Sequence, residues 1–84
     1  MIEAAQIKAA RALLGLSQLE LAQSAGVGLT TLKRIELSDP ISGSVRTVRS
    51  IQAALEAAGV EFIPQGDTKG PGVRLKHKRR GPMD

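Results

Sequence analysis

Two short amphipathic segments joined at a glycine limit what this chain can fold into more than any other feature. Ser17 and Glu20 have the spacing of a capping box, which begins a helix at residue 18. Gly26 ends that helix after about two turns, and a second helix is predicted over residues 29–37. Apolar residues recur through both segments at helical spacing, at Leu21, Ala22, Ala25, Val27, Leu32 and Ile35. Because helices this short are stable only when packed, the pair predicts a bihelical corner within a larger helical domain.

Two more helices are predicted to flank this corner. Residues 3–14 are rich in helix-forming residues, and their apolar positions form one stripe before Gly15 ends the helix. After a loop interrupted by Pro40, Ser44 can cap a helix over residues 45–58, which ends at Gly59. The pattern therefore predicts four helices in residues 1–59.

The sequence changes character after residue 59. Residues 60–63 are mostly apolar, residues 73–76 alternate apolar with basic positions, and the stretch between them is rich in glycine and proline. We expect two short strands around a loop. The predicted fold is mainly α, with a short C-terminal β-strand pair in residues 60–76 and a basic disordered tail in residues 77–84.

Composition excludes several classes of protein. The chain has 84 residues and a single aromatic residue, Phe62. Because it has no cysteine, it offers no disulfide, thiolate metal site or cysteine nucleophile. No apolar run approaches a membrane span or a signal peptide, and we expect a soluble, cytoplasmic protein. The one histidine, His77, has no ligand-type or catalytic neighbours. We therefore expect no enzyme activity, no cofactor and no metal site.

The positive charge is concentrated at one end. Residues 1–68 contain six Lys and Arg against seven Asp and Glu, whereas residues 69–84 contain six against one. Such a cluster can contact nucleic-acid phosphates or simply keep the chain soluble, and charge alone favours neither role.

The spaced residues of the bihelical corner resemble the lambda repressor and Cro family of helix-turn-helix proteins, also called the XRE family. The resemblance covers roughly residues 6–58. It is carried by Gly15-Leu16-Ser17-Gln18, Leu21-Ala22, Ala25-Gly26-Val27, Leu32 and Ile35-Glu36. It implies a four-helix repressor-like domain that binds double-stranded DNA. Such a protein is a transcriptional regulator, and most often it represses transcription by binding an operator.

The resemblance also implies roles for individual residues. The second helix of the corner would lie in the major groove, with base edges met by Gly28, Leu29, Thr30, Lys33 and Arg34. The DNA backbone would be contacted by Gln18, Thr31 and Ser44. Arg11 and Glu36 stand where family members pair an arginine with a glutamate, and this pair would be either partly buried or exposed.

One recognition helix reads only one half-site, so we expect a homodimer. The candidate dimerisation residues lie on the predicted strands, at Val60, Phe62, Ile63, Val73 and Leu75. In the alternative, the strand pair folds back onto the fourth helix of its own chain and the protein is monomeric.

Two other functions fit the same sequence. The chain could be an antitoxin that represses its own operon while its C-terminal part holds a toxin. It could also be an interaction module without DNA binding, which recruits a protein by strand addition along residues 60–75. Preference for one operator over random duplex would separate the regulator from the interaction module.

Overall fold

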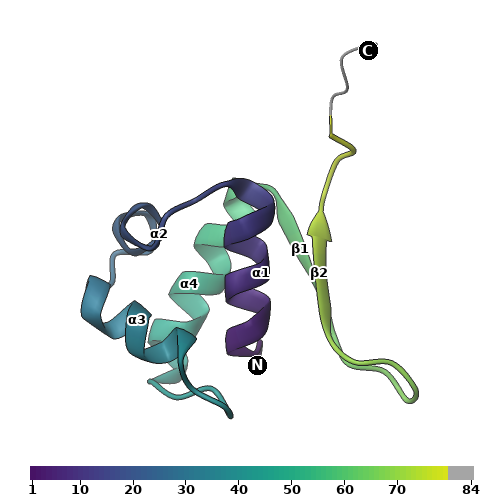
Figure 1. Cartoon of the computed structure of the whole chain (residues 1–84), viewed down its shortest axis with the longest axis horizontal. Helices are drawn as coiled ribbons and strands as arrows, with labels where there is room; N and C mark the ends of the chain where they lie inside the picture. The colour runs from purple at the N-terminus through teal and green to yellow at the C-terminus, as the bar shows by residue number, and fades with distance from the viewer. Residues whose placement is uncertain (80–84) are drawn as a thin grey trace.

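The computed structural model describes residues 1–79 of the chain and contains four helices followed by a two-stranded sheet (Figure 1). The elements, in chain order, are α1 (Ala4–Leu14), α2 (Gln18–Ala25), α3 (Leu29–Glu36), α4 (Val45–Ala58), β1 (Val60–Ile63) and β2 (Gly72–Leu75). A mainly α fold with a short C-terminal strand pair is therefore confirmed, although β2 begins and ends one residue before the predicted strand.

Local sequence sets the ends of the short helices. The Ser17 hydroxyl accepts from the Glu20 backbone N–H at 3.0 Å, and the Glu20 carboxylate accepts from the Ser17 N–H at 2.9 Å. These two bonds satisfy donors that have no partner at the start of α2, and the bonds from Ser17 lower the pKa of Glu20. Gly26 ends α2 with φ near +68°, a left-handed conformation that favours glycine, so the chain can turn at once into α3.

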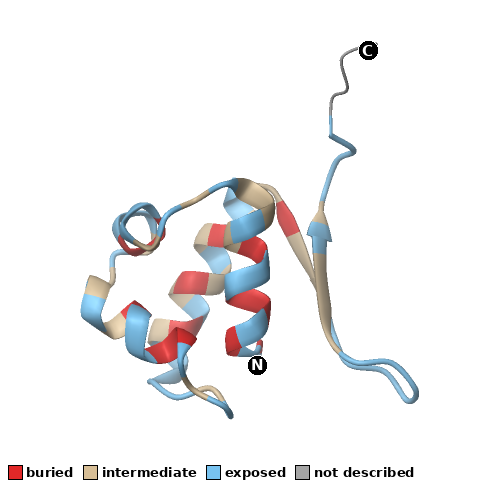
Figure 2. Ribbon diagram, viewed as in Figure 1, coloured by how far each residue is buried: buried red, intermediate tan, exposed pale blue. Residues whose placement is uncertain are grey.

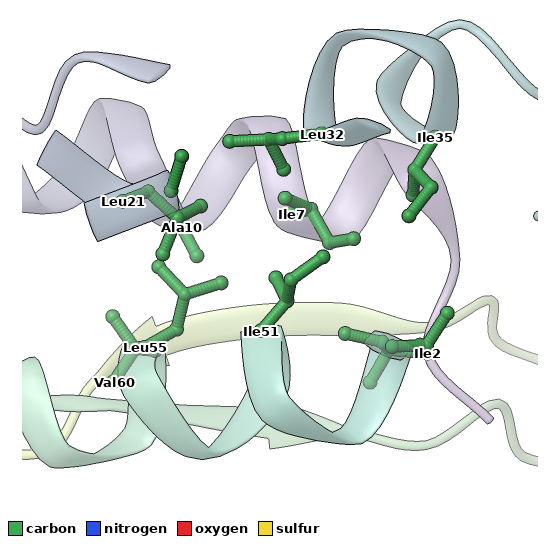
Figure 3. Packing of buried hydrophobic residues seen from close by; sticks show 11 residues of the cluster. Ile2, Ile7, Ala10, Leu21, Leu32, Ile35, Ile51, Leu55 and Val60 are labelled. Carbon is green, nitrogen blue, oxygen red and sulfur yellow. The ribbon is translucent and has the colours of Figure 1, made fainter. Parts of the chain in front are cut away.

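A single apolar core holds the four helices together (Figure 3). Ile7 of α1, Leu21 of α2 and Leu32 of α3 are fully buried, together with Ile51 and Leu55 of α4. Figure 2 shows buried segments on α1, α3 and α4, and exposed segments on the same helices. Each fully buried Leu or Ile side chain contributes about 1.5–3 kcal/mol to the stability of the fold. Because Leu32 belongs to this core, the core that stabilises the domain also fixes the orientation of α3.

The hairpin lies against α1 and α4 of its own chain. β1 and β2 are antiparallel, with Val60 opposite Leu75 and Phe62 opposite Val73. Residues paired in this way share one face of a sheet, and here all four pack on the helical core. β2 lies mainly along α1, whereas β1 lies mainly along α4. The hairpin therefore extends the core on the side opposite α3 (Figure 1).

A buried glutamine fastens the hairpin to α1. Gln6 is 6% exposed, and its side-chain amide donates to the backbone carbonyls of Gly72 at 2.8 Å and Ile63 at 3.4 Å. Its carbonyl oxygen accepts from the Glu3 N–H at 2.8 Å. A polar side chain at a core position is stable only with such partners, so Gln6 sets the position of the hairpin along α1.

No helix within residues 1–79 is long and apolar enough to cross a membrane. The basic tail predicted over residues 77–84 lies partly outside the described residues, which end at Arg79.

Candidate nucleic-acid interface

Helix α3 presents a polar surface because its apolar residues are used to hold it in place. Leu32 and Ile35 are fully buried. Thr30, Lys33 and Arg34 lie on the exposed surface of the same eight-residue helix. An α-helix with its side chains is about 10–12 Å across, which suits the width of a DNA major groove, about 12 Å. The exposed side chains offer hydrogen-bond donors and two positive charges.

A buried ion pair connects α1 to the end of α3. The Arg11 guanidinium donates two hydrogen bonds to the Glu36 carboxylate, from Nε at 2.7 Å and from Nη2 at 2.8 Å. Glu36 is only 3% exposed, and the Arg11 side chain is 20% exposed. Hydrogen bonding to Glu36 raises the pKa of Arg11 above its ordinary value, so Arg11 remains charged throughout the pH range in which proteins fold.

Gln18, at the start of α2, belongs to the same cluster. Its side-chain amide donates to the Glu36 Oε1 atom at 3.2 Å, while Arg11 also donates to the Leu16 carbonyl at 3.1 Å. One carboxylate therefore joins three helices. Part of the Gln18 side chain remains available to solvent, and its amide group has a second N–H and a carbonyl oxygen to offer.

A shallow groove beside this cluster is lined mainly by cationic and amide side chains. It lies between α1, α2 and α3, and its lining includes Lys8, Arg11, Gln18 and Lys33. The acidic residue at this groove, Glu36, is already paired with Arg11. The net positive charge and the neighbouring start of α2 make this groove suitable for a phosphate group.

The start of α4 offers a second surface of this kind. Ser44 is its N-cap, and the Ser44 hydroxyl accepts from the Thr47 N–H at 3.1 Å. Arg46 lies exposed in the first turn, where no acidic residue is present. A cation at a helix N-terminus is unfavourable by about 0.3–1 kcal/mol, and an external anion would remove that cost.

The other predicted DNA-contacting residues fall around α3. Gly28 is its N-cap and is exposed. Leu29 is half-buried and packs against the core, which leaves only part of its side chain for a ligand. Thr31 is also half-buried, on the face of α3 between the core and solvent.

The structure separates the predicted dimerisation residues into two groups. Val60 is fully buried in its own subunit, and Phe62, Val73 and Leu75 pack partly buried against the same core. Ile63 is 38% exposed. The pairing of these strands with a second copy stays a prediction, and most of their apolar side chains already have partners within one chain.

The basic residues after β2 contact the ends of two helices. The Lys76 ammonium donates to the Glu56 carbonyl of α4 at 2.7 Å, and Arg79 donates to the Leu13 carbonyl of α1 at 2.8 Å. Both carbonyls lie at helix C-termini, where positive charge is favourable. The disorder of the tail stays a prediction, and its residues 80–84 lie outside the described part of the chain.

Sequence reasoning missed four residues that the structure makes prominent. Lys8 and Arg46 are visible in the sequence as isolated cations, but only packing brings Lys8 beside Gln18 and Lys33. Gln6 resembles any other polar residue of a helix, although the residues four positions away on either side, Ile2 and Ala10, are buried and mark its face as the inner one. Arg79 lies 66 residues after Leu13 in the sequence, and the hairpin brings it to the Leu13 carbonyl of α1.

Comparison with known proteins agrees with this arrangement. The model of the helix-turn-helix family matches residues 7–60, which is more than half of the chain. The match includes all four helices from Ile7 onward and ends at the first residue of β1. No match was found among curated proteins. The chain belongs to the helix-turn-helix family of the lambda Cro type, the XRE family, and is a DNA-binding regulator.

Proposed function

We propose that the protein binds an operator sequence as a homodimer and represses transcription by occupying a promoter or its own operator. The observation that carries the proposal is the exposed surface of α3, on which Thr30, Lys33 and Arg34 project from a helix fixed by buried Leu32 and Ile35. A rigid helix with exposed donors is what major-groove readout requires.

The side chains of α3 differ in the bases they would read. Arg34 or Lys33 can donate to guanine O6 and N7, and Thr30 can donate or accept. The exposed part of Leu29 can contact a thymine methyl group. Gly28 has no side chain, so its role is to let the start of α3 approach the bases closely. Specificity in this proposal comes chiefly from Arg34, because a bidentate arginine–guanine contact discriminates most strongly.

Contacts with phosphates would hold α3 in position. Gln18, Thr31 and Ser44 are the candidates from the sequence, and the structure adds Lys8 and Arg46. Lys8 lies in the groove with Gln18, and Arg46 lies in the first turn of α4 beside Ser44. Such contacts contribute affinity and register without reading the sequence of the DNA.

The dimer follows from the size of the reading surface. A single α3 covers one half-site, and two half-sites about 34 Å apart on one face of DNA would be read by two copies. The strand segment at residues 60–75 is the part of the chain that we assign to association.

Selection from a random pool of duplexes tests this function. We expect the bound fraction to converge on a two-fold symmetric sequence, with an affinity at least about 1,000-fold above that for random duplex at the same salt concentration. A pool that shows no enrichment after several rounds, although the protein is folded, would refute sequence-specific binding.

A further inference from the structure

The chain leaves β2 through residues 76–79, which we call the cationic segment and which are exposed at every position. Three of its residues, Lys76, Lys78 and Arg79, carry a positive charge. In the described part of the chain, none of these three pairs with a carboxylate. Their charge is therefore not neutralised by a neighbouring side chain.

Two of the three cations are held against the ends of helices. The Lys76 ammonium donates to the Glu56 carbonyl of α4, and Arg79 donates to the Leu13 carbonyl of α1. An ammonium group has three N–H donors and a guanidinium group has five, so most of these donors remain for a ligand. The contacts fix the cationic segment at the C-terminal ends of α1 and α4 without using up its donors.

The cationic segment lies across the core from the recognition helix. Leu32 and Ile35 turn one face of α3 toward the core, so the exposed face of α3 points away from it. The hairpin packs on the opposite side of α1 and α4, and the cationic segment continues from the end of β2 (Figure 1). A straight duplex that α3 holds in its major groove therefore does not reach this segment.

The side chains of the segment suit a polyanion better than a protein surface. Protein interfaces are built around an apolar core, whereas contacts with a DNA backbone need only cations and other hydrogen-bond donors. Leu75, the last apolar side chain before the segment, packs on the core of its own chain. Residues 76–79 contain no apolar side chain, so they offer charge and donors alone.

We infer that the cationic segment binds the phosphate backbone of a second duplex while α3 holds the operator, so that the protein bridges two segments of DNA. The second contact is independent of sequence, because it includes no base edge. This inference rests on the proposed operator binding and adds a further function to it. Random or long duplex can bind at this segment too, so the segment also adds to the salt dependence of overall DNA binding.

The number of cations sets the expected salt dependence of the second contact. Three phosphates neutralised by one subunit correspond to a slope of log affinity against log salt of about −2.7. Affinity for the second duplex should then fall about 40-fold between about 50 and 200 mM salt. Removing two of the three cations should leave a slope of about −0.9.

Capture of a second duplex by immobilised complexes tests the inference. The selected operator is attached to beads and loaded with protein, unbound protein is washed away, and labelled random duplex is added at 50 mM salt. The test variant carries Lys78→Gln with Arg79→Gln. The control carries Lys69→Gln with Arg74→Gln, which removes two charges from the hairpin outside the cationic segment.

We expect the wild type and the control to capture the labelled duplex. The test variant should hold as much operator and capture at least about tenfold less of the second duplex. Unlabelled operator should compete with the labelled duplex no better than unlabelled random duplex does, because the segment reads no bases. Preferential competition by the operator would mean that an unoccupied α3 holds the second duplex.

Four outcomes would overturn the inference. They are a wild type that holds the operator and captures no duplex, a test variant that captures as much as the control, preferential competition by the operator, and capture of labelled polyglutamate in place of the duplex. The last outcome would assign the segment to an acidic protein. Failure to hold the operator would refute the proposed function, whereas operator held without capture would refute only the bridging.

Discussion

Removal of the Glu36 carboxylate should destabilise the whole domain. In Glu36→Ala, the Arg11 guanidinium loses the partner to which it donates at 2.7 and 2.8 Å, and it is too buried to be fully hydrated instead. Breaking a buried ion pair in this way costs about 3–5 kcal/mol, and the partial exposure of Arg11 places the expected loss near about 3 kcal/mol. A domain of 84 residues has a total stability of about 4–13 kcal/mol, so this loss is a large fraction.

Thermal unfolding followed by circular dichroism measures the effect. We expect the midpoint to fall by about 12–24 °C, at about 4–8 °C per kcal/mol for a domain of this size. The matched control is Arg74→Ala, which breaks the exposed pair with Glu61 and should cost less than about 1 kcal/mol. Replacing Arg11 and Glu36 together by leucine should recover part of the loss, because no unpaired charge remains. If Glu36→Ala and Arg11→Ala shift the midpoint no more than Arg74→Ala, the pair does not hold α3 to α1.

Three further predictions concern the turns, the helix start and the tail. Gly43→Ala should lower the free energy of unfolding by about 1–3 kcal/mol, because φ at Gly43 is +101° and the added Cβ would lie 3.1 Å from Ile35 Cδ1. Denaturant unfolding measures this loss, and the control Gly66→Ala should show none, because a Cβ at Gly66 meets nothing within 4 Å. Because the pKa of Glu20 is lowered in the folded protein, its contribution to stability is present above the pKa of the unfolded chain, about 4.3, and is lost as the pH falls through the folded-state pKa. An NMR titration in which the Glu20 carboxyl titrates at or above the unfolded pKa would contradict this. Deletion of residues 77–84 should flatten the dependence of log affinity on log salt by about 0.9 for each phosphate that the tail neutralises in the intact protein, and an unchanged slope would make the tail a solubiliser.

Sequence was sufficient for the helices because their signals are local. Ser17 with Glu20, and the glycines at 15, 26 and 59, mark helix ends through bonds within a few residues. The strands were also predicted, from the apolar residues at 60–63 and the alternation at 73–76. The packing of the hairpin could not be predicted in this way. Its place along α1 depends on hydrogen bonds from Gln6 to the carbonyls of Ile63 and Gly72, which lie 57 and 66 residues later in the sequence.

The candidate site was predictable only where family resemblance supplied it. The resemblance placed Arg34 and Lys33 on the recognition helix and named Arg11 with Glu36, which the structure brings within hydrogen-bond distance. It did not indicate that Gln18 would share the Glu36 carboxylate, because that contact joins helices whose crossing is set by the core. Residues that act across helices, such as Lys8, carry no periodic signal in the sequence.

Readout of bases by α3 is the central claim, and the affinity of Arg34→Ala for the selected operator tests it most directly. We predict a loss of about 1–3 kcal/mol, together with relaxed preference at one base pair of each half-site. Affinity for random duplex should fall less than affinity for the operator, because random duplex binding does not include the base contact. If Arg34→Ala and Lys33→Ala both fold and both bind the operator as the wild type does, α3 does not read the DNA.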